Sequence, residues 1–94
     1  MALVWSARAK RDVREIGTYI AQNNRTAAVA MVKRIVATAE NLNEYPLMGQ
    51  VGRVDDTREL IISSAPYIVV YRTTTRGIRI IAVMHTSREW PNSF

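Results

Sequence analysis

The first half of the chain repeats apolar residues at the three- and four-residue spacing of amphipathic helices. This spacing predicts one helix over residues 7–22 and a second over about residues 26–42. Ser6 is suited to cap the first helix, and the polar segment at residues 23–26 separates the two. Because the connection is so short, the two helices should form an antiparallel hairpin.

The second half changes to apolar runs rich in β-branched residues, which favour strands. Such runs predict strands at residues 57–63, 67–73 and 78–85, and the short apolar run at residues 2–5 is also β-leaning. The intervening residues 43–56 contain one proline and two glycines, and they are expected to form a loop.

This order of elements predicts an α+β fold with the sequence β-α-α-β-β-β. The last three strands should form an antiparallel meander, with both helices packed on one face of the sheet. The first strand should join the sheet at an edge or beside the last strand. The apolar runs are nearly continuous, so both faces of the sheet should be partly covered. With 94 residues, the chain is expected to form a single domain, residues 1–94.

Composition narrows the classes of site that the chain can hold. It has no cysteine and one histidine, so we expect no metal site, no disulfide and no cofactor. Neither a secretory signal nor an apolar stretch of membrane-spanning length is visible, so a cytoplasmic location is expected. The net charge is +5, and all but two of the 13 basic residues are arginine. Arginine favours bidentate contacts with carboxylates or phosphates, which indicates an acidic partner.

The single histidine, His85, ends the last predicted strand. Strict alternation would place His85 on one face with Arg79, Ile81 and Val83, and we expect this more polar face to point away from the helices. A histidine framed by arginines could perform acid–base chemistry on RNA phosphates. The simpler interpretation, which we favour, is a strand-terminal histidine with a satisfied hydrogen bond.

Arginine and tryptophan are the residue types most often found as anchors of protein interfaces. Trp90 follows the last strand and either anchors a partner from an exposed tail or closes the end of the core. Arginines on or beside the sheet could provide a docking surface for an acidic partner. The residues that we predict to contact a partner are Arg58, Arg72, Arg79, His85, Arg88 and Trp90.

Four segments together resemble the RelE/ParE superfamily of bacterial toxins, and especially its ParE branch. They are the tryptophan that closes the first strand, "TREL", "PYIVVYR" and "VMHTSREWP". The resemblance covers nearly the whole chain and implies a growth-inhibiting toxin neutralised by a cognate antitoxin. The antitoxin of this family wraps its toxin with an acidic or amphipathic segment. The resemblance also implies inhibition of DNA gyrase, contact with operator DNA only through the antitoxin complex, and a possible higher-order toxin–antitoxin oligomer.

The RelE branch instead cleaves mRNA in the ribosome and needs basic residues on its central strands. Here the matching positions hold Ile68, Glu59 and Ile61, which cannot stabilise the charge of a reacting phosphate. A ribonuclease would have to rely on Arg58, His85 and Arg88. We therefore expect a non-enzymatic gyrase inhibitor, with a ribosome-dependent ribonuclease as the alternative. A third possibility is a basic module that serves mainly to assemble with its antitoxin on operator DNA.

Overall fold

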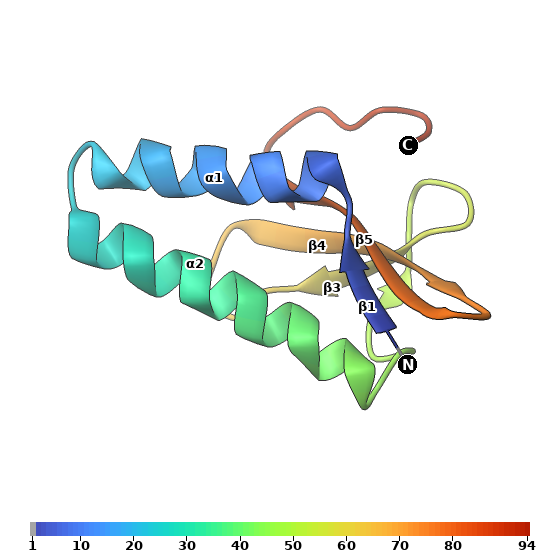
Figure 1. Cartoon of the computed structure of the whole chain (residues 1–94). Helices are drawn as coiled ribbons and strands as arrows, with labels where there is room; N and C mark the ends of the chain where they lie inside the picture. The colour runs from blue at the N-terminus through green and yellow to red at the C-terminus, as the bar shows by residue number, and fades with distance from the viewer. Residues whose placement is uncertain (1) are drawn as a thin grey trace.

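The computed structural model describes residues 2–94 and places two helices across one face of a five-stranded sheet (Figure 1). The elements in chain order are β1 (Ala2–Trp5), α1 (Ala7–Ala21), α2 (Arg25–Glu40), the 3-10 turn η1 (Asn41–Asn43), β2 (Gln50–Val51), β3 (Arg58–Ile61), β4 (Tyr67–Thr74) and β5 (Gly77–His85). The strands lie in the order β1-β5-β4-β3-β2. β1 runs parallel to β5, and the other neighbours are antiparallel.

The predicted α+β class is confirmed, and β1 lies both at an edge and beside the last strand, as expected. The sheet nevertheless differs from a plain meander with one added strand. Residues 50–51, predicted as part of a loop, pair with β3 as the short strand β2. A two-residue strand with both side chains exposed carries no hydrophobic alternation, so the sequence pattern gave no sign of it.

Local capping sets where the two helices begin. The Ser6 hydroxyl accepts a hydrogen bond from the Ala9 amide at 3.0 Å, and the Asn24 side chain accepts one from Ala27 at 2.9 Å. The helices form the predicted antiparallel hairpin (Figure 1). Their buried stripes and the facing side of the sheet form the main core, whose fully enclosed side chains include Ile35, Ala39, Leu42, Ile62, Val69, Tyr71 and Ile80.

A β-bulge in β5 changes which residues share a face of the sheet. Val70 pairs with Ala82, whereas the next residue, Tyr71, pairs with Ile80, so Ile81 is the extra residue. Beyond the bulge the alternation is inverted. Val83 packs in the main core with the helices, and Ala82 packs with Ile81 on the opposite face.

The predicted orientation of His85 is therefore wrong. His85 pairs with Tyr67, and the two rings meet edge-on with centroids 5.4 Å apart. Because Tyr67 belongs to the main core, His85 lies on the helix side of the sheet rather than facing away from it. A one-residue bulge cannot be detected from an apolar run in which either register buries hydrophobic side chains.

The C-terminal tail (residues 86–94) covers the sheet face opposite the helices. Trp90 and Phe94 pack there on a second apolar cluster that contains Val70, Ile81, Ala82 and Met84. This confirms that both faces of the sheet are partly covered.

A buried carboxylate joins the tail to the sheet. Glu59, 3% exposed, accepts hydrogen bonds from the backbone amide, Nε and a terminal nitrogen of Arg53 at 2.7, 3.1 and 3.1 Å. The Arg53 guanidinium in turn lies 3.6 Å from the centroid of the Trp90 ring. Burial would raise the pKa of Glu59, but the hydrogen bonds and charge of Arg53 together hold the pKa below its ordinary value of 4.5.

We predict that this contact makes stability sensitive to acid. A lowered pKa in the folded state stabilises the protein above the ordinary pKa of 4.5, and this contribution disappears as the pH falls through the folded pKa. Glu59→Gln should lower the free energy of unfolding at pH 7 by about 1–2 kcal/mol, a small value because Arg53 is half exposed and screened by solvent. It should also flatten the loss of stability below pH 4.5. Urea unfolding from pH 3 to 7 measures both effects, and a variant as acid-sensitive as the wild type would contradict the assignment.

Candidate functional site

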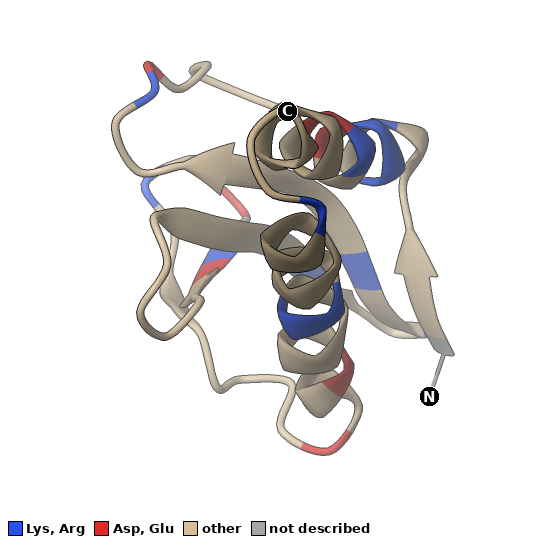
Figure 2. Ribbon diagram, turned by 90° about the vertical axis from the view of Figure 1, so that its left-hand side faces the viewer, with Lys and Arg blue, Asp and Glu red and all other residues tan. Residues whose placement is uncertain are grey.

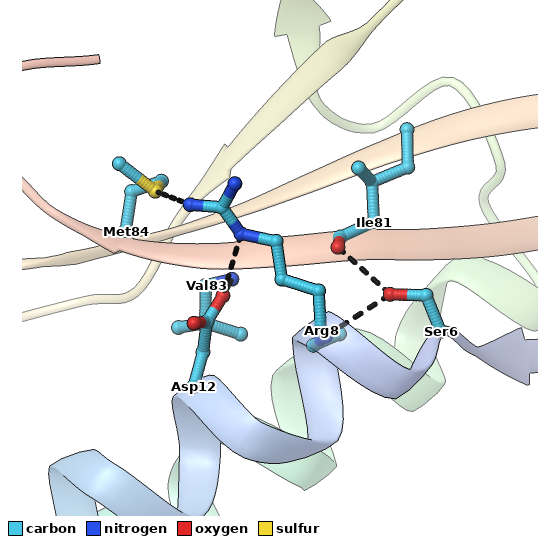
Figure 3. Close-up of polar contacts among 7 residues, drawn as sticks. Ser6, Arg8, Asp12, Ile81, Val83 and Met84 are labelled. Carbon is cyan, nitrogen blue, oxygen red and sulfur yellow. Dashed lines mark hydrogen bonds and ion pairs between the residues drawn. The ribbon is translucent and has the colours of Figure 1, made fainter. Parts of the chain in front are cut away.

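Helix α1 is fixed to the edge of β5 at the point where β1 ends. The Ser6 hydroxyl donates to the carbonyl of Ile81 at 2.8 Å, and the Asp12 carboxylate accepts from the Val83 amide at 3.0 Å (Figure 3). These side chains satisfy backbone groups that no strand reaches, since the last residue of β1, Trp5, pairs with Ile80. The carbonyl of the bulged residue, Ile81, thus binds the N-cap residue of α1 and fixes where this helix begins on the sheet.

Arg8 lies over the same edge of the sheet. Its Nε is 3.6 Å from the Asp12 carboxylate, and a terminal nitrogen is 3.5 Å from the Met84 sulfur (Figure 3). The guanidinium also lies 5.0 Å from the centroid of the Phe94 ring, in the C-terminal tail. Arg8 therefore links α1, β5 and the tail.

A groove of about 520 Å³ opens between α1 and the ends of β4 and β5. Arg8 and Arg88 supply two positive charges to its lining, and Asp12 and Glu15 supply two negative charges. The aromatic and polar side chains that line it are Tyr19, Tyr67, His85 and Ser87. Because the charges balance, the groove offers mixed polar recognition and no concentrated positive field for a phosphate.

The hydrogen bonds of His85 determine which ring nitrogen carries its proton. Nδ1 accepts from the Ser87 backbone amide at 3.0 Å, and the Ser87 hydroxyl lies 2.7 Å from the same nitrogen. A backbone amide can only donate, so the neutral ring carries its proton on Nε2. In this tautomer the basic nitrogen is Nδ1, and it is occupied by Ser87. The expected satisfied hydrogen bond of a strand-terminal histidine is present.

Arg58 does not join His85 in one site. Arg58 pairs with Tyr71 on β4 and His85 pairs with Tyr67, so the two residues are about 13 Å apart along the strand direction alone. The Arg58 guanidinium is used internally: it donates to the carbonyl of Gly49 at 2.6 and 3.1 Å and to that of Leu47 at 3.3 Å.

The other predicted contact residues lie in three different settings. Arg72 and Arg79 are directly opposite each other on β4 and β5, and Arg72 is held by the side chain of Asp56 at 3.3 Å. Arg88 is exposed in the tail at the rim of the groove. Trp90 lies beneath Arg53 with its indole nitrogen enclosed, so it closes the second cluster and is not an exposed anchor. Only His85 and Arg88 share the groove.

Of the two roles left open for Trp90, closing the end of the core is the one that the structure shows, whereas the partner contacts predicted for Arg58 stay a prediction. Both side chains hold other segments in place, and replacing either with alanine would also cost stability.

One surface was missed by the sequence analysis. The anchored loop (residues 45–51) exposes four large apolar side chains, Tyr45, Leu47, Met48 and Val51. The sequence did contain a sign of this surface. Large apolar residues in a segment that is predicted to be a loop have no helix or strand face to bury them, so they are expected to be exposed.

Between residues 2 and 94, no group of three or more His, Cys, Asp or Glu side chains is placed to hold a metal ion. The helices in this part of the chain are too short or too polar to cross a bilayer.

Comparison with protein families decides what kind of protein this is. Residues 3–90 match the family described as the ParE toxin of type II toxin–antitoxin systems. The chain belongs to the ParE toxin family. Y4kP of Sinorhizobium fredii, named as a toxin, is 42% identical to this ParE-family chain over 87 residues, 93% of this chain and 90% of Y4kP. The toxin RelE2 of Caulobacter vibrioides is 33% identical over 86 residues, 92% of this chain and 96% of RelE2.

Solved structures share the fold of this ParE-family toxin. The chromosomal ParDE toxin–antitoxin system of P. aeruginosa contains a chain with a TM-score of 0.82 and 22% identity, covering 93% of this chain and 97% of the other. A chain of the E. coli RelBE toxin–antitoxin complex has a TM-score of 0.58 and 19% identity, covering 92% and 96%. These matches support a cognate antitoxin as a partner of this type II toxin.

The proton position on His85 can be tested by nuclear magnetic resonance. In the ¹⁵N-labelled ParE-family toxin at pH 8, we expect the imidazole Nδ1 to resonate as a bare nitrogen and Nε2 as a protonated one, because Ser87 donates to Nδ1. Ser87→Pro removes the amide donor and should allow both tautomers. A wild-type spectrum dominated by a protonated Nδ1 would refute the assignment.

Proposed function

We propose that this ParE-family toxin arrests growth by binding DNA gyrase and that its cognate antitoxin neutralises it. The proposal takes the gyrase target from the likeness to the ParE branch. The structure supports action by binding rather than by catalysis, and the central observation is the hydrogen bonding of His85. In this arrangement the basic nitrogen of His85 is engaged by its own chain at Ser87, and an RNA hydroxyl would have to displace that contact before His85 could remove its proton.

The surroundings of His85 support the same conclusion. Arg58, which the ribonuclease mechanism would need, lies opposite Tyr71, about 13 Å along β4 from the residue that pairs with His85, and it binds loop carbonyls. The positions where an RNA-cleaving relative needs cations are Glu59, Ile61 and Ile68. Glu59 is neutralised by Arg53, and Ile61 and Ile68 are aliphatic.

A RelE-type ribonuclease is the second candidate, because Arg8 and Arg88 line the groove together with His85. Their two charges are matched by those of Asp12 and Glu15, which leaves little net attraction for an RNA backbone.

The purified toxin separates the two candidates directly. We expect it to inhibit supercoiling of relaxed plasmid DNA by bacterial gyrase, and we expect addition of the antitoxin to restore supercoiling. In a ribosomal translation assay, the mRNA should remain intact. Intact supercoiling together with mRNA cleavage at ribosomal positions would replace the gyrase proposal with the ribonuclease.

His85→Gln provides the matching variant, since glutamine keeps a neutral polar side chain. For a residue at the side of a binding surface, we expect gyrase inhibition to change by less than about tenfold. A general acid–base role would instead predict a loss of toxicity of about 10²–10⁴-fold. Growth curves after induction of each variant measure the difference, with protein levels matched by immunoblot.

A further inference from the structure

The end of the C-terminal tail is attached to the sheet by side-chain packing alone. The Arg88 amide donates to the His85 carbonyl at 3.1 Å, but from Glu89 on no hydrogen bond or ion pair joins the tail to any part of residues 2–94. Residues 90–94 carry no charged side chain, and Figure 2 shows this end of the tail in tan. We call residues 89–94 the strap; they form neither helix nor strand.

Two aromatic side chains make the contacts of the strap, and each lies against an arginine. Trp90 and Phe94 pack on the second cluster. The Arg53 guanidinium is 3.6 Å from the centroid of the Trp90 ring, and that of Arg8 is 5.0 Å from the centroid of the Phe94 ring. Contacts of this kind are weak individually where solvent reaches them. The strap therefore depends on two rings for its attachment.

Docking of the strap also leaves one polar group unsatisfied. The indole nitrogen of Trp90 is enclosed and has no hydrogen-bond acceptor among residues 2–94. When the strap lifts, this N–H can donate to water, so docking gains apolar burial but loses a hydrogen bond. Segments with few buried contacts and no backbone hydrogen bonds open at free energies well below that of global unfolding.

The residues beneath the strap belong to strands that do not depend on it. Val70 and Ala82 are fully buried, and Ile81 and Met84 are nearly so. These residues lie on β4 and β5, which pair with each other along their length. A lifted strap would therefore expose apolar side chains on a sheet that remains folded.

Arg8 connects the strap with the groove. Its side chain lines the groove, where its Nε lies 3.6 Å from the Asp12 carboxylate, and its guanidinium also contacts the Phe94 ring. Loss of the Phe94 contact removes one of the groups that position Arg8. By the reciprocity of linked equilibria, a contact in the groove that turns Arg8 away from Phe94 favours the lifted strap.

We infer that the strap is a reversible cover, which lifts from the sheet without global unfolding and is coupled to the groove through Arg8. The docked strap hides the second cluster. The lifted strap exposes this cluster and releases the Arg8 guanidinium on the Phe94 side. The inference concerns the toxin alone and does not depend on which target it binds.

Alkylation of single thiols tests whether the strap lifts by itself. The chain has no cysteine, so Val70→Cys and Val69→Cys each carry one thiol. The two valines are adjacent on β4 and fully buried, but Val70 lies in the second cluster and Val69 in the main core. Without denaturant, we expect iodoacetamide to alkylate Val70→Cys at least about tenfold faster than Val69→Cys, because only the latter requires global unfolding. Mass spectrometry measures both rates, and Ser93→Cys gives the rate of an exposed thiol.

Second substitutions in the Val70→Cys chain test the attachment of the strap and its coupling to the groove. Phe94→Ala and Arg8→Gln should each raise the alkylation rate at least about twofold, as expected for loss of one exposed cation–π contact. Asn92→Ala and Arg11→Gln are matched controls at exposed positions of the strap and of α1, and they should leave the rate unchanged. In the Val69→Cys chain, the rate should follow global stability alone.

Each rate is compared with the global stability of the same variant, measured by urea unfolding. If Val70→Cys and Val69→Cys open with the same free energy, the strap leaves only when the whole protein unfolds, and the inference is overturned. Alkylation of Val70→Cys as fast as Ser93→Cys would also overturn it, since the strap would then not be docked. An unchanged rate with Arg8→Gln would overturn the coupling to the groove. If circular dichroism shows that Val70→Cys does not fold, Ala82→Cys replaces it, with Ala39→Cys as the control in the main core.

Discussion

The hydroxyl of a single buried tyrosine joins the parts of this protein that matter most for binding. The Tyr71 side chain is fully enclosed in the core between the helices and the sheet, yet its oxygen reaches outward to Gly49 and Pro46. Tyr71 also pairs with Ile80, directly beside the bulge in β5. A buried hydroxyl without partners would cost about 1–3 kcal/mol, so core packing and loop position are specified together.

Strand β4 consequently separates two surfaces of different chemistry. At its Tyr67 end, α1 and the bulged β5 form a groove with balanced charges and a histidine whose Nδ1 accepts from Ser87. At Tyr71, near the middle of β4, the anchored loop exposes apolar side chains.

The sequence predicted the helices, the long strands and the fold class because these depend on periodic patterns. It failed where a single residue changes the geometry. The bulge at Ile81 reversed the expected face of His85, and the short strand β2 had no pattern of its own. The internal role of Arg58 was also out of reach, since the loop carbonyls that it binds lie in a segment that only the folded chain brings close. For Trp90 the sequence left two roles open, and its packing on the second cluster beneath Arg53 selects the closing of the core.

Hydrogen exchange at the Gly49 amide tests most directly whether the Tyr71 hydroxyl holds the loop. The account predicts that this amide is protected in the wild type and exchanges at nearly the rate of an unstructured peptide in Tyr71→Phe, while amides in the centre of β4 stay protected in both. A Gly49 amide that exchanges freely in the wild type, or that stays protected in Tyr71→Phe, would contradict it.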